Sequence, residues 1–350
     1  MNILDDLNQI NLFDPTKMSE RISNLPTLLK KASSQNIQPS KNDIRNIRDV
    51  IFAGMGGSAI AANIVLDYIG ISRSIPMTVN RQEELPYKPS NNTLLIINSF
   101  SGNTEETINI FKLALKTSCK IIVVTSGGKL LQLASENNIE TITMTVTGEP
   151  RSVVPYHLVV LINLLSAYHL LEIQNSDINA IIKLSTTLIK TYGIDNPTSD
   201  NLAKQLANNL KNKLICVYGG GIFTSMSLRW KTQINENAKT TCISDTIPEL
   251  LHNTIESFQK FEQFNDSMFF LVLQPSNTTV WLQEKYKTLK TLFETYNLTH
   301  EYLQIDETDI LRQIISMMIL CDYTSYYLAI LKSVDPSTND VIDSAKKMMS

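Results

Sequence analysis

Short apolar runs alternate with helix-like segments from about residue 50 onward, and this alternation restricts the fold more than any other feature. The apolar runs lie near 50–53, 77–79, 94–98, 120–125 and 141–145, and the helical stretches lie near 57–69, 104–117 and 129–136. Short apolar runs without polar alternation are typical of strands that are buried on both faces. The sequence therefore predicts an α/β fold in which helices cover both faces of a parallel sheet.

A second round of the same pattern begins near residue 214. The run Leu214–Tyr218 leads into three glycines and a helical segment, as Val50–Ala53 does in the first half. A strand is expected again over Met268–Gln274. Because the two rounds start about one domain length apart, we interpret them as an internal duplication. The predicted organisation is an N-terminal helical segment, a first domain, a helical connector and a second domain with a C-terminal helix, over 1–45, 46–171, 172–212 and 213–350.

The stretch Ser99–Thr107 joins an apolar run to a helical segment and is rich in hydroxyl groups. The first turn of a helix has unpaired N–H groups and a partial positive charge. Ser99, Ser101 and Thr104 can add hydroxyl donors to these N–H groups. Such an arrangement suits a phosphate group, so the sequence predicts a phosphate-binding loop here.

A purely structural interpretation of this loop competes with the phosphate site. Asn103 would be the N-cap of an ordinary helix, and Glu106 would complete a pair that resembles a capping box. The second half has Pro275-Ser276-Asn277-Thr278 at the matching place, without the hydroxyl pattern. We therefore expect one phosphate site per chain, in the first half.

The glycine loop after the first predicted strand also fits a loose dinucleotide-binding fingerprint, Gly54-x-Gly56-x-x-Ala59. That fingerprint requires an acid at the end of the next strand, where the sequence has Val79-Asn80-Arg81. The missing acid disfavours an oxidoreductase. A third interpretation is that the glycines only allow close packing between helix and strand. No Gly-Lys-Ser/Thr follows either glycine loop, so a Walker-type nucleotide site is not supported.

Composition and charge exclude several classes of function. A net charge of −3 disfavours electrostatic binding of nucleic acid. The four cysteines are scattered and are expected to be reduced and mostly buried, in a cytoplasmic protein. The first residues lack the basic and apolar regions of a signal peptide, and no apolar run approaches the roughly 20 residues that span a bilayer. The four dispersed histidines do not form a metal-binding motif, and no metal or cofactor is expected.

An acid–base pair can be recognised in the second half. Arg229, Gln233 and Glu236 follow one another at helical spacing, which places them on one face of a helix. A solvated face with Arg229 pairing through Gln233 to Glu236 is the plainer interpretation. A lone histidine, His252, follows shortly afterwards. A carboxylate and a histidine near a phosphate pocket are what an aldose–ketose isomerase requires for proton transfer and ring opening.

Seven motifs, in order, resemble the bifunctional phosphoglucose/phosphomannose isomerase family over roughly residues 45–347. They are Gly54-Met-Gly-Gly-Ser-Ala-Ile, Ser99-Phe-Ser-Gly-Asn-Thr-Glu-Glu-Thr, Thr125-Ser-Gly-Gly, Glu149-Pro-Arg-Ser, Arg229-Trp-Lys-x-Gln-x-Asn-Glu-Asn-Ala-Lys, Pro248-Glu-Leu-x-His-Asn and Val334-Asp-Pro. The resemblance implies two tandem sugar-isomerase (SIS) domains, each a flavodoxin-like parallel sheet flanked by helices. It also implies a homodimer with active sites at the subunit interface. Residues matching the family's phosphate and sugar ligands are Gly56, Gly57, Ser58, Ser99, Ser101 and Thr104.

The resemblance also implies roles for four catalytic residues. Glu236 would move the proton between C1 and C2, and Arg151 would stabilise the enediolate charge. His252, from the neighbouring subunit, would open the sugar ring together with a lysine near the C-terminus. Lys346 aligns best with that lysine, but Lys347 is adjacent. The plainer alternatives are a surface ion pair for Arg151 and a solvated side chain for either lysine.

The sequence departs from the family in two places. Thr254 stands where the family has a glutamate beside the ring-opening histidine, and Phe100 stands where a tyrosine is frequent. If the glutamate orients His252, its loss lowers the basicity of the histidine. We expect isomerase activity to be retained.

The predicted function is the interconversion of glucose 6-phosphate and mannose 6-phosphate with fructose 6-phosphate through a cis-enediol, without a metal ion. A non-catalytic sugar-phosphate sensor is the alternative, since SIS domains also occur in regulators. Against it, the chain keeps the acid–base residues and has no basic recognition helix for DNA.

Overall fold

The computed structural model describes residues 3–39, 46–264 and 266–349. The chain forms two compact units. Pro26–Ile182 make one, here called the N-terminal sheet unit, and Met1–Leu25 with Lys183–Ser350 make the other, the C-terminal sheet unit. The end of the predicted N-terminal helical segment, 40–45, lies outside the described residues. The domain boundaries drawn from the sequence stay predictions.

The N-terminal sheet unit is built on five parallel strands in the order β2-β1-β3-β4-β5. The strands are β1 (Asp49–Ala53), β2 (Met77–Asn80), β3 (Thr93–Ser99), β4 (Lys120–Thr125) and β5 (Glu140–Thr143). This is the flavodoxin-like strand order. All five strands form where apolar runs predicted them.

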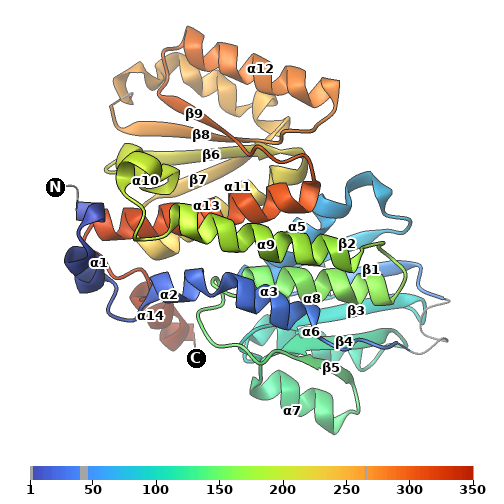
Figure 1. The fold of residues 1–350 in the computed structure, drawn as a ribbon. Coiled ribbons are helices and arrows are strands. Elements are labelled where there is room, and N and C mark those ends of the chain that lie inside the picture. Colours follow the sequence, from blue (N-terminus) through green and yellow to red (C-terminus); the bar gives the residue numbers. More distant parts are fainter. Residues whose placement is uncertain (1–2, 40–45, 265, 350) are drawn as a thin grey trace. The chain divides into compact units, whose positions relative to one another are not determined.

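Helices cover both faces of this sheet (Figure 1). The helices of this unit are α3 (Leu25–Ser33), α5 (Gly56–Ile69), α6 (Glu105–Ala114), α7 (Gly128–Glu136), α8 (Val154–Ala167) and the first part of α9 (Asn175–Tyr192), with a short 3-10 helix η2 (Gly70–Ser72). Phe111 of α6 and Leu130 of α7 pack with Ile51, Leu95 and Val123 on one face. Helices α5 and α8 pack together on the opposite face.

The C-terminal sheet unit repeats the arrangement with four parallel strands in the order β7-β6-β8-β9. These are β6 (Leu214–Gly220), β7 (Cys242–Ile247), β8 (Met268–Gln274) and β9 (His300–Gln304). The order matches that of the first four strands of the other unit, as the predicted duplication requires. The predicted fold class, α/β with two parallel sheets flanked by helices, is therefore confirmed.

Two groups of helices flank the second sheet. Helix α12 (Val280–Thr295) packs on one face through Tyr286 and Phe293, while α10 (Leu202–Leu210), α11 (Thr224–Ala238) and α13 (Ile310–Leu331) lie on the other (Figure 1). The remaining helices of this unit are η1 (Ile3–Asp5), α1 (Leu7–Phe13), α2 (Met18–Ser23), η3 (Thr198–Asp200), η4 (Gly221–Phe223), η5 (Glu249–His252), η6 (Thr254–Phe264) and α14 (Asp340–Met349).

Helix α13 corrects one expectation from the sequence. It has 22 residues and a mean hydropathy of 1.5 over its best window, so it is long and apolar enough to cross a membrane. That window is wholly buried, as in the core helix of a soluble protein. The sequence shows no long apolar run here because polar residues such as Gln313 and Asp322 interrupt it, so the length of this apolar helix was not predicted.

The cysteines behave as the sequence predicts. All four are free, and Cys216, Cys242 and Cys321 are buried while Cys119 is partly buried. Burial raises the pKa of the Cys216 thiol to about 12, so this thiol stays protonated and unreactive at neutral pH.

Candidate functional site

The two predicted phosphate loops follow β1 and β3, which are neighbours in the first sheet. The chain leaves β1 toward β2 on one side and returns to β3 on the other, so these strands flank the topological switch point, where ligands bind in open α/β sheets. The loops touch each other there. The backbone N–H of Phe100 donates to Oγ of Ser58 at 3.3 Å, and the side-chain amide of Asn98 donates to the Ser58 carbonyl at 2.9 Å.

The capping interpretation of the serine-rich loop is wrong. Helix α6 begins one residue later than predicted, and its N-cap is Thr104, whose side chain makes no capping hydrogen bond. The side-chain oxygen of Asn103 instead accepts the backbone N–H of Lys129, at 2.9 Å. Ser99 Oγ donates to Thr104 Oγ1 at 3.2 Å, so two of the predicted phosphate ligands lie side by side. The N-terminus of α6 is therefore lined by hydroxyls rather than closed by its own cap.

The two glycines of the first loop differ in their surroundings: Gly56 borders open space, and Gly57 allows close packing. Gly56 has a φ of +49°, and a Cβ there would meet nothing within 4 Å, so its backbone borders open space at the start of α5. A Cβ on Gly57 would lie 2.7 Å from the carbonyl oxygen of Pro150. Gly57 therefore allows close packing, because its missing side chain leaves room for the segment that carries Arg151.

Arg151 is buried, with 3% of its surface exposed. The alternative of a surface ion pair is therefore wrong for this residue. Because the carbonyl of Pro150 packs on Gly57, the backbone that carries Arg151 lies beside the glycine loop. A buried cation favours an anionic ligand or a developing negative charge.

The dinucleotide interpretation loses further support at the end of β2. Asn80, which stands where a ribose-binding acid is needed, is buried. Its side-chain amide donates to the carbonyls of Gln82 and Glu84, at 3.4 and 2.8 Å. Asn80 therefore closes its own turn.

The equivalent switch point of the second sheet, between β6 and β8, is filled by a side chain. The Tyr286 hydroxyl accepts the N–H of Gly220 at 2.8 Å and donates to the carbonyl of Leu273 at 2.8 Å. Burial raises the pKa of Tyr286, which keeps this hydroxyl protonated as a donor. The position that corresponds to the phosphate loops is thus occupied by the protein itself, which agrees with a single phosphate site in the first half.

Helix α11 carries Glu236, but its polar face is not the solvated one of the plainer interpretation. Arg229 and Gln233 are buried, and both donate to Oδ1 of Asp322 on α13, at 2.7 and 2.6 Å. Glu236, partly exposed, follows on the same side of α11. Sequence reasoning missed Asp322, which lies about ninety positions away inside an apolar helix.

His252 is exposed at the end of η5. The next segment is fixed by Thr254, whose hydroxyl donates to Oδ2 of Asp245 on β7 at 2.5 Å. Asn253 donates from its side-chain amide to Glu249 at 2.9 Å. His252 therefore lies on a loop that is held by hydrogen bonds of its neighbours, and its side chain is exposed to solvent in the single chain.

The candidate lysines lie on α14, where Lys346 and Lys347 are both exposed. Lys239 links the start of this helix to the end of α11. Its ammonium donates to the carbonyls of Glu236, Asp335 and Thr338 at 2.8, 2.8 and 2.9 Å. The segment that leads into α14 is therefore anchored beside the turn that carries Glu236.

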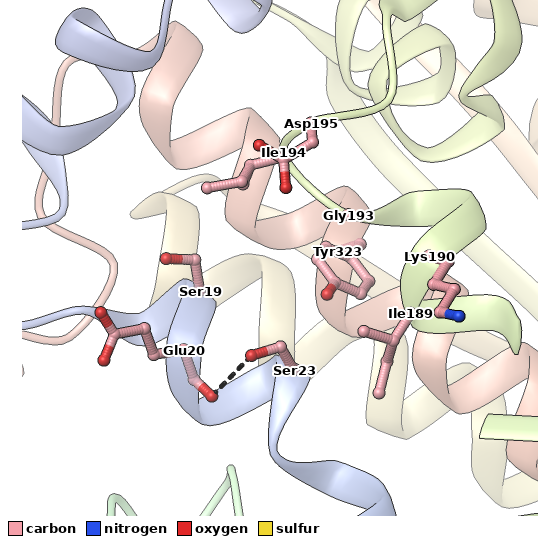
Figure 2. A pocket seen from close by; sticks show the side chains of 9 residues that line it. All are labelled: Ser19, Glu20, Ser23, Ile189, Lys190, Gly193, Ile194, Asp195 and Tyr323. Carbon is pink, nitrogen blue, oxygen red and sulfur yellow. Dashed lines mark hydrogen bonds between the residues drawn. The ribbon is translucent and has the colours of Figure 1, made fainter. Parts of the chain in front are cut away.

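The predicted site residues fall into two groups. Gly56, Gly57, Ser58, Ser99, Ser101, Thr104 and Arg151 belong to the N-terminal sheet unit, and Glu236, His252 and Lys346 belong to the C-terminal sheet unit. A cavity of about 260 Å³ in the latter, between α2, the end of α9 and Tyr323, is lined by none of them (Figure 2). Among the described residues, no group of three metal-ligating side chains lies close enough to hold an ion.

Comparison with known proteins identifies similar chains. Residues 199–349 match the family model of the bacterial phospho-glucose isomerase C-terminal SIS domain. The bifunctional phosphoglucose/phosphomannose isomerase of Caldicellulosiruptor bescii is 31% identical over 335 residues, which cover 95% of this chain and 98% of that protein. The protein of the same name from Thermoplasma acidophilum is 28% identical and covers 86% of this chain and 90% of its own length.

A solved structure shows the same fold. The glucose-6-phosphate isomerase like protein from Thermus thermophilus superposes with a TM-score of 0.65 at 16% identity, covering 99% of both chains. At that identity the likeness concerns the fold alone.

Proposed function

Because the chain belongs to the bifunctional phosphoglucose/phosphomannose isomerase family, it is a sugar-phosphate isomerase, and we propose that it interconverts glucose 6-phosphate and mannose 6-phosphate with fructose 6-phosphate. The two aldoses differ only at C2 and give the same cis-enediol. One base and one pocket that tolerates either configuration at C2 can therefore serve both substrates. The proposed reaction uses no metal ion.

The phosphate is proposed to bind at the β1/β3 switch point. The ligands would be Gly56, Gly57, Ser58, Ser99, Ser101 and Thr104. Supporting this, the Ser58 and Phe100 loops are in hydrogen-bond contact, and the side chain of Thr104 leaves the first turn of α6 uncapped. Uncapped N–H groups and hydroxyls at a helix N-terminus favour a phosphate over a neutral group.

The proton transfer is proposed to use Glu236 as the base. Its carboxylate would take the proton from C2 of the aldose and return it to C1. Arg151 would stabilise the negative charge that develops on the enediolate oxygens, because a preorganised cation acts most strongly where water is excluded. The burial of Arg151 supports this role.

Ring opening is proposed to use His252 and Lys346. His252 would come from a second copy of the chain in a homodimer. Its exposure in the single chain, and the exposure of Val341 and Met348 on α14 at 83% and 87%, support a covering partner. A cytoplasmic location is part of the proposal, supported by four free cysteines.

The observation that carries the proposal is the pairing of an uncapped, hydroxyl-lined helix start with a buried arginine at one switch point. It is tested by assaying both aldose phosphates with a chelator present. We expect turnover to persist with the chelator, and Glu236→Gln to reduce kcat by about 10² to 10⁴-fold. Glu284→Gln, an exposed change on α12, should leave turnover intact. Stabilisation by sugar phosphates without turnover in the wild type would instead identify a sensor.

The shared site is tested by mixing inactive subunits. Glu236→Gln and His252→Ala chains, unfolded and refolded together, should regain about a quarter of wild-type activity, since half of the dimers are mixed and each has one complete site. If the mixture stays inactive, the histidine acts within its own chain or the chain is a monomer.

A further inference from the structure

We propose that Asp322 is a positioning residue that holds the helix carrying Glu236 in its catalytic orientation. The inference rests on the proposed function, because it takes Glu236 to be the base. It concerns a residue that no motif in the sequence marks.

The geometry around Asp322 is specific. One carboxylate oxygen, Oδ1, accepts from the guanidinium of Arg229 at 2.7 Å and from the amide of Gln233 at 2.6 Å. These donors lie one turn apart on α11, and Glu236 comes three residues after Gln233. One turn further along, Asn237 donates to Ser325 Oγ at 3.0 Å. Three successive turns of α11 are therefore tied to α13 by polar contacts, which fix the rotation of α11 about its own axis.

A gain in folding stability does not by itself explain these contacts. Arg229 is 1% exposed and Asp322 is 6% exposed, so both charges lose most of their hydration. Apolar side chains of similar volume often replace such buried pairs without loss of stability. The network also leaves Arg229 Nε and Gln233 Oε1 buried without a hydrogen-bond partner among the described residues. Unsatisfied buried atoms in a native structure call for an explanation beyond packing.

Orientation supplies that explanation. The hydrophobic effect is non-directional, whereas a hydrogen bond weakens steeply when its angle changes, so two short hydrogen bonds to one oxygen define the rotation of α11 more narrowly than apolar contacts do. A general base must meet its proton at hydrogen-bond distance, and a displacement of about 1 Å can cost on the order of 100-fold in rate. A small rotation of α11 would move Glu236 while the phosphate loops, which belong to the other unit, stay unchanged.

The test separates orientation from stability. Asp322→Ala, which removes the accepting oxygen, should lower kcat on the order of 100-fold while KM for glucose 6-phosphate changes less than about twofold, because phosphate binding is untouched. The matched control is Asp5→Ala, which removes the ion pair of Asp5 with the buried Lys204 in the same unit, 3.3 Å long and without a contact to Arg229 or Gln233. Both variants are assayed well below their melting temperatures, with kcat expressed per folded molecule. If kcat of Asp322→Ala equals that of Asp5→Ala, the inference is overturned.

A second variant covers the case in which Asp322→Ala does not fold. The triple change Arg229→Met, Gln233→Met and Asp322→Leu replaces the whole polar group by apolar packing and leaves no buried donor without an acceptor, so it should melt close to the wild type. The inference requires it to fold and still lose kcat without a change in KM. Full activity in this variant contradicts positioning. The Glu236→Gln assay separates the two proposals: if that variant keeps turnover, the base itself is wrong.

Discussion

The side-chain hydroxyl of Thr254 donates a hydrogen bond to Oδ2 of Asp245, which ties the loop after His252 to the edge strand β7. Position 254 is where the sequence departs from the family by lacking an acid. A carboxylate nevertheless stands beside it, supplied by the neighbouring strand. In place of a loop glutamate, this chain therefore has the Thr254 hydroxyl bound to the carboxylate of Asp245 on the sheet.

Restoring the acid at position 254 should destabilise the protein. Thr254→Glu brings a second carboxylate against Asp245, and two like charges at about 4 Å repel by about 1 kcal/mol even in a water-like dielectric. Chemical denaturation should show a lower free energy of unfolding for Thr254→Glu than for Thr254→Gln, which has the same size. Adding Asp245→Asn should abolish the difference. If the Glu and Gln variants are equally stable while Asp245 is retained, position 254 does not contact the Asp245 carboxylate in solution.

Removing the Ser101 hydroxyl should weaken substrate binding and leave chemistry intact. A hydrogen bond to a charged group contributes about 1.5 to 3 kcal/mol, so Ser101→Ala should raise KM for both aldose phosphates by at least about tenfold. Steady-state kinetics with each substrate measures this, and inhibition by inorganic phosphate should weaken in parallel. Ser135→Ala, an exposed serine on α7, is the control. An unchanged inhibition constant for phosphate would place the anion elsewhere.

Gly57→Ala should disturb the Arg151 segment. The new Cβ would lie 2.7 Å from the Pro150 carbonyl and 3.1 Å from Val154, so the backbone must shift. Overpacking of this kind costs about 1 to 3 kcal/mol of unfolding free energy. Gly127→Ala is the matched control, because a Cβ there meets nothing within 4 Å. Denaturant titration of both variants gives the comparison, and equal stabilities would show that the close contact is relieved without cost.

His157 should make the protein less stable in mild acid. It is 1% exposed, neither ring nitrogen has a hydrogen-bond partner among the described residues, and burial lowers its pKa from 6.5 to about 3. Below pH 6.5 the unfolded chain therefore binds a proton that the folded chain does not. The free energy of unfolding should fall by about 1.4 kcal/mol on going from neutral pH to pH 5.5.

The measurement for His157 is a series of denaturant titrations between pH 7.5 and pH 5.5. His157→Phe should remove this part of the pH dependence, whereas His169→Gln, at an exposed position, should keep it. Parallel pH profiles for the wild type and His157→Phe would mean that the ring is hydrated in solution.

The sequence predicted all five strands of the first sheet, including its edge strands β2 and β5, but it missed the two edge strands of the second sheet. β1, β3, β6 and β8 are buried on both faces, so their residues form uninterrupted apolar runs. β7 and β9 have a neighbour on one side only, and residues such as Ser244 and Glu301 are partly exposed. An edge strand needs no apolar run, so its sequence resembles that of a loop.

The candidate site could be proposed from the sequence where its residues are close together in the chain. The loop around Ser99–Thr104 carries its hydroxyls within a few positions, so the pattern is visible without a structure. The contact between Arg229 and Asp322 and the contact between Asn103 and Lys129 each join positions far apart in the chain. No local sequence pattern predicts such contacts. The capping prediction for Asn103 failed for this reason, since a tertiary partner displaced the local one.

In the second sheet, the hydroxyl of Tyr286 bridges Gly220 at the end of β6 and Leu273 of β8, so the protein itself occupies the place that corresponds to the proposed phosphate site of the first sheet. Under the proposed function, the first sheet would therefore bind the anion, and the helices on the second sheet would present the acid and the base. A titration with inorganic phosphate should accordingly saturate at a single equivalent per subunit.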